Sequence, residues 1–270
     1  MQTIFIFAKI ILSLAFLIFA SWSDYKTREV SNRVWKFYAP IALFLSFSEL
    51  FLYEFSKLPL FGLSFGITFF FAIILFYSGG FGGADSKALI CIALALPFST
   101  EKLFTPLLTS EISPLSQNLF PLTIFSNSVL FAAVSGLYIL MRNTIKRVTT
   151  RRKLFEGSLS NESIWKKILV LITGYKVPIA KLEEKWHVYP MEDIGINEEN
   201  QPKRKLIIVP KDEGRNEIVE RLYKAVDARK ISDQIWVTPG LPMLIFITLG
   251  LIVAVLFGDL VWILISMILG

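Results

Sequence analysis

The stretch "GGFGGADSKALICIALALPF" (Gly79–Phe98) is unusual because four glycines lead into an aspartate and a lysine, and a short apolar segment follows at once. An ionisable side chain beside a membrane helix is costly, so Asp85 is expected to have a function. The whole chain has a membrane-like composition, with 54% hydrophobic residues and a mean hydropathy of +0.57. The search for function therefore begins with how often the chain crosses a bilayer.

Six apolar segments recur along the chain, and about 20 residues are needed to span a bilayer as a helix. They lie at about 3–22, 37–53, 58–77, 88–98, 122–141 and from 241 to the C-terminus. The fourth is short and must either include the glycine-rich lead-in or be shielded by its neighbours. In the third, the Gly62-x-x-x-Gly66 spacing favours close helix packing. The predicted fold class is a membrane all-α protein with six transmembrane helices.

A polar region separates the fifth and sixth segments. Residues 142–238 hold 20 of the 28 lysines and arginines and 14 of the 22 acidic residues. "RKLIIVP" (204–210) predicts a strand, "NEIVERLYKAVDARK" (216–230) an amphipathic helix, and "MEDIGINEENQ" (191–201) a surface loop. We therefore expect three parts: residues 1–141 with helices 1–5 and the aspartates Asp24 and Asp85, a small cytoplasmic α+β domain at 142–238, and helix 6 at 239–270.

Basic residues set the expected orientation, because cytoplasmic loops of membrane proteins carry an excess of lysine and arginine. The loop after the first segment and the stretch after the fifth are rich in them, whereas 54–57 and 99–121 are poor. With six crossings, the basic loops and the Gly79–Lys87 stretch all fall in the cytoplasm and both termini lie outside. A cleaved signal peptide at 1–21 is the alternative, but no cluster of positive charge precedes this apolar run.

Composition also excludes several kinds of chemistry. The chain has one cysteine, Cys91, and one histidine, His187, so it can form no intrachain disulfide and no Cys/His metal cluster. We therefore expect no metal and no cofactor. Cytoplasmic basic loops explain the net charge of +6 without nucleic-acid binding. Any catalysis must come largely from carboxylates.

Two aspartates are predicted to lie at the same depth. Asp24 follows the first apolar segment and Asp85 precedes the fourth, both at the cytoplasmic side. In aspartic proteolysis one carboxylate takes a proton from water while the other, still protonated, polarises the scissile carbonyl. Alternatively, Asp85 caps a helix and Asp24 pairs with Lys26 or Arg28. Position alone leaves both interpretations open.

Local motifs carry a family resemblance. "GGADSK" (82–87) resembles the Gly-x-Gly-Asp-x-Lys signature of type IV prepilin peptidases and archaeal preflagellin peptidases, which are GxGD-type membrane aspartyl proteases. "DYKTREVSNRVW" (24–35) resembles their second catalytic segment, and "IWVTPGLPMLIFI" (235–247) resembles the entry to the last helix of the archaeal branch. The chain departs from the strict pattern at Ala84, which stands where the signature has glycine.

The resemblance implies a multi-pass aspartyl endopeptidase of the cell membrane, with Asp24 and Asp85 as its catalytic pair. Gly82, Gly83, Ala84 and Lys87 would support the motif or bind substrate. The partners implied are flagellin-like or pilin-like precursors, whose short basic leader would be removed at the cytoplasmic surface of the bilayer. Without substrate, we expect the two carboxyl groups not to be in hydrogen-bonding contact, because a dry pair repels unless it shares a proton.

Other charged residues receive simpler interpretations. Lys9 and Glu49 are expected at the same depth in the outer part of the membrane, so we predict that they pair. Lys87 either extends to the lipid headgroups or tunes Asp85. Glu29 balances nearby basic residues or receives a basic leader residue. Asp259 is expected at the membrane interface, and His187 on the domain surface.

Two other functions compete with proteolysis. A proton-coupled transporter would use Asp24 and Asp85 as a proton relay, but it predicts carboxylates near mid-bilayer and often an internal repeat, and the chain shows neither. A non-catalytic assembly scaffold would not depend on Asp24. The peptidase is the function that the sequence favours.

Overall fold

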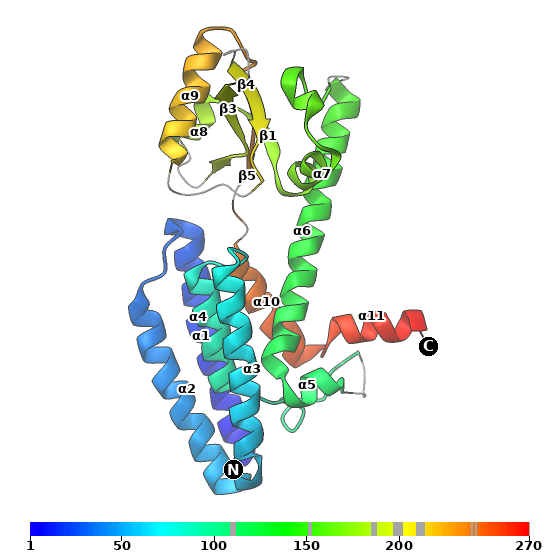
Figure 1. The fold of residues 1–270 in the computed structure, drawn as a ribbon. Coiled ribbons are helices and arrows are strands. Elements are labelled where there is room, and N and C mark those ends of the chain that lie inside the picture. Colours follow the sequence, from blue (N-terminus) through cyan, green and yellow to red (C-terminus); the bar gives the residue numbers. More distant parts are fainter. Residues whose placement is uncertain are drawn as a thin grey trace. The chain divides into compact units, whose positions relative to one another are not determined.

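The computed structural model describes residues 1–108, 112–150, 153–184, 188–196, 202–208, 214–238, 240 and 242–269. The chain divides into two compact units (Figure 1). The helical unit consists of Met1–Ala132 and Pro242–Gly270, and the α/β unit of Ala133–Leu241.

The helical unit consists mainly of long apolar helices. They are α1 (Gln2–Thr27), α2 (Asn32–Tyr53), α3 (Leu58–Tyr77), α4 (Gly83–Ala95), α5 (Pro114–Asn118), the first part of α6 (Phe120–Thr150), α10 (Met243–Leu256) and α11 (Leu260–Leu269). Among the described residues, four helices are long and apolar enough to cross a membrane, or five if α10 and α11 form one span. The mostly helical membrane class is thus seen, and a count of six spans stays a prediction.

Helix α4 has only 13 residues and ends inside the bundle. The last carbonyl groups of a helix have no partner within it, and without water they must find one elsewhere. Here Ser46 Oγ of α2 donates to Leu94 O at 2.7 Å, and Ser64 Oγ of α3 donates to Pro97 O at 3.0 Å. Serines of two neighbouring helices therefore allow α4 to stop within apolar surroundings.

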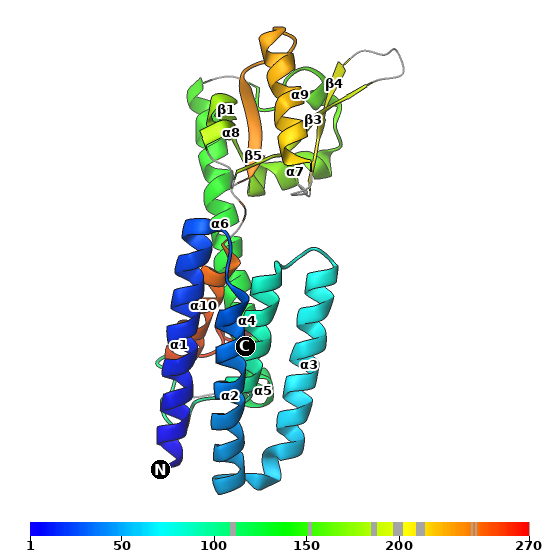
Figure 2. The same ribbon diagram turned by 90° about the vertical axis from the view of Figure 1, so that its left-hand side faces the viewer.

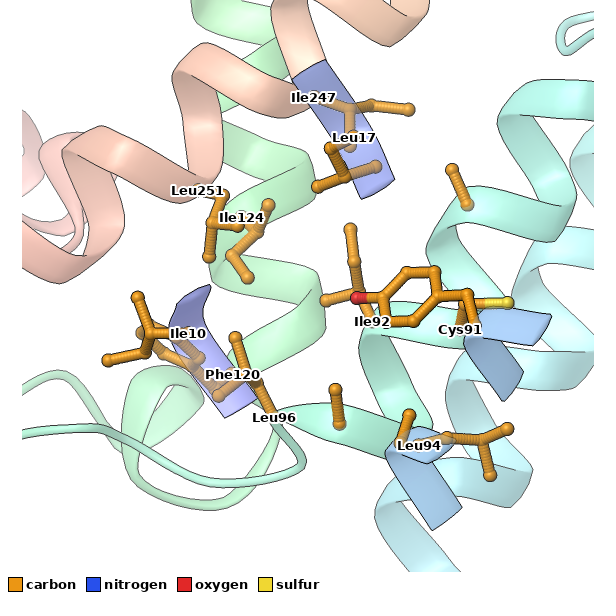
Figure 3. Close-up of a cluster of buried hydrophobic side chains, with 14 of the residues drawn as sticks. Ile10, Leu17, Cys91, Ile92, Leu94, Leu96, Phe120, Ile124, Ile247 and Leu251 are labelled. Carbon is orange, nitrogen blue, oxygen red and sulfur yellow. The ribbon is translucent and has the colours of Figure 1, made fainter. Parts of the chain in front are cut away.

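Neighbouring helices also cover α4 along its sides. Ala88, Leu89 and Ile92 are fully buried. In Figure 3, Ile92 and Cys91 lie in the same cluster as Leu17 of α1, and α6 and α10 contribute further side chains to it. Figure 2 shows α4 alongside α2 and α3. The short fourth segment is shielded by neighbours, which was one of its two predicted alternatives.

Two helices pack closely at Gly250 and not at Gly62 and Gly66, the pair whose spacing suggested close packing. A Cβ atom at Gly62 or Gly66 would meet nothing within 4 Å, so the predicted close approach there is wrong. At Gly250 of α10, however, a Cβ atom would lie 2.5 Å from Ile124 O of α6 and 2.3 Å from Ser128 Oγ. The backbones of α6 and α10 approach each other where the side chain is absent.

The final apolar segment bends. α10 and α11 meet at an angle of 63°, with Asp259 at the break. Asp259 is buried within the protein: Ser113 Oγ donates to its Oδ2 at 2.8 Å, and the Trp262 N–H donates to its Oδ1 at 3.1 Å. Its predicted position at the membrane interface stays a prediction. A carboxylate that caps the first turn of α11 compensates for the hydrogen bonds lost where the helix breaks.

Lys9 of α1 and Glu49 of α2 form a buried ion pair, as predicted. Lys9 Nζ lies 2.5 Å from Glu49 Oε2, and the two side chains are only 7% and 8% exposed. Gln2 Nε2 donates to the other carboxylate oxygen at 3.3 Å. Each charge offsets part of the cost of placing the other away from water.

The α/β unit contains two small sheets and several helices. Strands β1 (Tyr175–Pro178), β5 (Gln234–Thr238) and β2 (Tyr189–Pro190) form an antiparallel sheet in the order β1-β5-β2, and β3 (Glu192–Ile196) pairs with β4 (Pro202–Leu206). The helices are the end of α6, η2 (Gly157–Asn161), α7 (Ile164–Thr173), α8 (Ala180–Glu184) and α9 (Arg215–Asp227). Helix α9 confirms the predicted amphipathic helix, with Leu222 fully buried.

One sequence interpretation in this unit is wrong. The segment beginning at Met191 is not a surface loop throughout, because its residues 192–196 form strand β3. Glu192 is completely buried: Arg204 Nη2 lies 2.5 Å from its Oε2, and the Trp236 N–H donates to its Oε1 at 2.8 Å. The pattern of charged residues concealed the strand because its carboxylate points inward to an arginine. The predicted strand at 204–210 begins earlier, at Pro202, and ends at Leu206.

Replacing Glu49 by glutamine should strongly destabilise the helical unit. The Glu49→Gln variant leaves the Lys9 ammonium buried without its counter-charge, and breaking such a pair costs about 3–5 kcal/mol. Unfolding in detergent micelles measures the loss. The matched control is Glu29→Gln, which removes an exposed carboxylate. A Lys9→Met/Glu49→Leu double variant should recover most of the stability. Equal stability of Glu49→Gln and the unmodified protein would contradict the assigned pairing.

Candidate active site

Asp24 lies in the last turn of α1, partly exposed. Arg28 ends this helix in a left-handed conformation, with φ of 56°, and its N–H donates to the backbone oxygen of Asp24 at 2.9 Å. The Ser23 and Thr27 hydroxyls both donate to Glu29 O, at 2.7 and 3.1 Å. The connection to α2 is thereby folded back on the end of α1, and the backbone that carries Asp24 ends in a well-defined helix terminus.

Asp85 lies in the first turn of α4, two residues after the helix begins. Its Oδ2 accepts a hydrogen bond from the Gly82 N–H at 3.0 Å. The helix-capping interpretation of Asp85 is therefore correct, and it is compatible with a chemical role because the second carboxylate oxygen is not used by this contact. An acidic side chain here is also stabilised by the positive end of the α4 dipole.

The fold brings Asp24 and Asp85 to the same end of the helical unit. α1 and α4 pack together, and α1 ends with Asp24 at the end of the bundle where α4 begins with Asp85 (Figure 2). Among the interactions of the described residues, no hydrogen bond joins them, in agreement with the sequence-based expectation. Each carboxyl group therefore has its own surroundings at this end of the bundle.

The motif glycines differ in what they do. A Cβ atom at Gly82 would lie 3.1 Å from Asp85 Oδ2, so the carboxylate would have to shift by a few tenths of an ångström to accommodate it. At Gly83 a Cβ atom would make only an ordinary contact with the Phe76 ring, at 3.6 Å. Gly79 needs its glycine for another reason, because its φ is +75°.

Ala84 fits its place without strain. It lies in the α4 helix, outside the positive-φ region, and its partly buried side chain packs against the main apolar cluster. The departure from glycine in the Gly-x-Gly-Asp pattern therefore adds a small apolar contact and does not disturb the backbone that holds Asp85.

Lys87 points toward α2. Its Nζ donates to Asn32 Oδ1 at 2.7 Å, and the side chain is exposed. On a helix, a residue two positions from another is rotated by about 200°, so Lys87 and Asp85 occupy different faces. Sequence analysis missed Asn32, whose signal was its place in the motif "DYKTREVSNRVW", in the polar pair before the apolar residue.

The remaining candidates stay away from this chemistry. Cys91 is buried among apolar side chains, and Glu29 is exposed. His187 lies outside the described residues. Within the described ranges, no group of three histidine, cysteine or acidic side chains is arranged to hold a metal ion.

Comparison with known families agrees with this arrangement. Residues 11–140 match the model of the type IV leader peptidase family, and residues 166–260 match the archaeal peptidase A24 C-terminus, type II. The first match includes both aspartates. This chain belongs to the type IV leader peptidase family. Both matched regions extend into the α/β unit, which is therefore part of the similarity to the archaeal branch of the family.

Three curated relatives of this family cover nearly the whole chain. The preflagellin peptidases of Methanococcus maripaludis (strain C6) and Methanococcus voltae are each 27% identical, over 252 and 249 residues. That of Methanocaldococcus jannaschii is 26% identical over 250 residues. Each alignment covers 90% of this chain and 91–92% of the relative. The family and its relatives support a peptidase role for this membrane protein.

Proposed function

We propose that this protein is a membrane aspartyl endopeptidase that removes the short basic leader from preflagellin-like or prepilin-like precursors. The observation that supports the proposal is that α1 ends with Asp24 and α4 begins with Asp85 at the same end of the helical unit. The names of the relatives supply the class of substrate. The family match supports peptide hydrolysis as the reaction, and we assign the chemical step to this carboxylate pair.

In the proposed mechanism, the two carboxyl groups divide the work of hydrolysis. The ionised one takes a proton from a water molecule, which then attacks the scissile carbonyl carbon. The protonated one donates a hydrogen bond to the carbonyl oxygen as negative charge develops there. Two like charges in a dry site resist double ionisation, so proximity itself favours the singly protonated state.

We further propose that substrate binding closes the site. Asp85 Oδ2 is held by the Gly82 N–H, and no described hydrogen bond links Asp85 to Asp24. The lead-in to α4 contains Gly79 and Gly80, which impose little conformational preference and allow this segment to move. A leader bound as an extended strand could exclude water and bring the carboxyl groups together in one step. Such closure restricts hydrolysis to chains that fit.

The proposed location of the reaction is the cytoplasmic surface of the cell membrane. The basic connection between α1 and α2 and the basic end of α6 support this orientation by the positive-inside rule. If the chain crosses the membrane six times and the polar region precedes the sixth crossing, both termini lie outside the cell. In this arrangement, a basic leader stays in the aqueous phase while the apolar helix of the precursor enters the bilayer.

Both Asp24→Asn and Asp85→Asn should abolish precursor cleavage, because neither the general-base nor the acid role survives without its carboxyl group. The measurement is loss of the leader from a co-expressed preflagellin, in membranes that contain equal amounts of each variant. Cys91→Ala and His187→Ala serve as controls and should retain cleavage. Activity of a tenth of the unmodified level in either aspartate variant would refute the catalytic pair.

Gly82→Ala should lower the cleavage rate without unfolding the protein. The added methyl group would lie 3.1 Å from Asp85 Oδ2, which forces the carboxylate to shift. A misplacement of about 1 Å can cost about 100-fold in rate, and this shift of a few tenths of an ångström should cost less. The matched control is Gly66→Ala in α3, whose methyl group meets nothing within 4 Å. If both variants cleave the precursor equally well, Gly82 does not position Asp85.

A further inference from the structure

A groove runs between α2 and α4 on a different face of α4 from Asp85. It encloses about 450 Å³. The two helices run in the same direction, because Lys87 contacts Asn32 near their starts and Ser46 contacts Leu94 farther along both. The groove therefore has one end at the two helix N-termini and extends toward the interior of the apolar segments.

One end of the groove is positively charged. Lys36 and Lys87 line it from opposite helices, and both side chains are exposed. Lys87 Nζ makes its hydrogen bond to a neutral amide oxygen, that of Asn32. Within the part of the chain that the structure describes, neither lysine forms an ion pair with a carboxylate, and no acidic residue lines the groove. Two cationic side chains therefore line the groove without a carboxylate beside them in its lining.

The other end is apolar. Ala39 lies one turn after Lys36, and Ile90 and Cys91 lie one turn after Lys87. Each lysine directly precedes the apolar run of its helix, at Phe37 and at Ala88. The groove is thus positively charged where the apolar segments begin, and it is lined by apolar side chains farther along. An anionic lipid is complementary to this arrangement, because it has a negative headgroup attached to hydrocarbon chains.

We propose that this groove is a binding site for an anionic phospholipid. Its phosphate would lie between Lys36 and Lys87, and an acyl chain would cover Ala39, Ile90 and Cys91. The basic leader of a precursor does not fit here, because the two lysines would repel it, and a free phosphate would leave the apolar wall uncovered. The proposal depends on the protein lying in a membrane and is independent of the proposed peptidase activity.

Lipid binding at this groove would act on the first turn of α4. Lys87 and Asp85 belong to the same turn, and the Lys87–Asn32 hydrogen bond already joins that turn to α2. A phosphate bound by both lysines adds a second connection between the helices. The bound lipid would thereby hold the α4 lead-in in place, although it touches neither aspartate.

Native mass spectrometry of the full chain in detergent tests the site, with titrations of phosphatidylglycerol and of phosphatidylcholine. Phosphatidylglycerol should bind more tightly to the unmodified protein. Lys36→Gln should weaken that binding by about fivefold, the factor expected for one lysine near an anionic lipid surface. Lys36→Arg should restore it, because the charge is kept. Lys26→Gln is the matched control, since it removes an exposed lysine that does not line the groove.

Four results would overturn the proposal. The first is equal phosphatidylglycerol binding by Lys36→Gln and the unmodified protein. The second is equal affinity for phosphatidylcholine, which would indicate an apolar groove without charge recognition. The third is competition by soluble glycerol phosphate at the concentration at which the lipid binds, which would indicate a site for free phosphate. The fourth is an increased KM for precursor in Lys36→Gln with unchanged lipid binding, which would make the groove a substrate contact.

Discussion

The backbone at both ends of α4 must be hydrogen-bonded within the protein, and this requirement organises the helical unit. A helix of 13 residues extends about 20 Å, which is less than the roughly 30 Å of a hydrocarbon core. Its carbonyl end is completed by Ser46 and Ser64 from two neighbouring helices, and its amide end by the carboxylate of Asp85. α4 can therefore be short only because the surrounding helices are in place, and its shortness determines where Asp85 lies.

Asp85 combines two demands on one side chain. As a cap it must keep an oxygen on the Gly82 N–H, and as the proposed catalytic acid it must face Asp24. A carboxylate can do both because it has two oxygens with about four acceptor positions. Gly82 has no side chain, which leaves room for the Asp85 carboxylate close to the Gly82 backbone. The local motif is thus explained by the space and hydrogen bonds that one carboxylate needs.

Much of this arrangement was accessible from sequence. Hydrophobic segments and the positions of Asp24 and Asp85 at their ends were sufficient to predict one shared end of the bundle. The Lys9–Glu49 pair followed from counting residues along helices. Features that depend on three-dimensional contact were not accessible: the burial of Asp259 at a helix break, the choice of Gly250 in place of Gly62 and Gly66, and the inward carboxylate of strand β3. In each case the pattern of residue types indicated the helix or segment, but it did not indicate which residues of other elements that segment would contact.

The Lys9–Glu49 pair has a consequence for how the chain enters the bilayer during synthesis. A lone lysine or glutamate deep in a transmembrane helix opposes insertion by roughly 3 kcal/mol on biological scales. Lys9 belongs to α1 and Glu49 to α2, and only a short connection separates these helices. Inserting α1 alone would expose its ammonium to lipid until the carboxylate arrived. The first two helices are therefore best accommodated as a single helical hairpin, so that biogenesis begins with a two-helix unit whose charges are already matched.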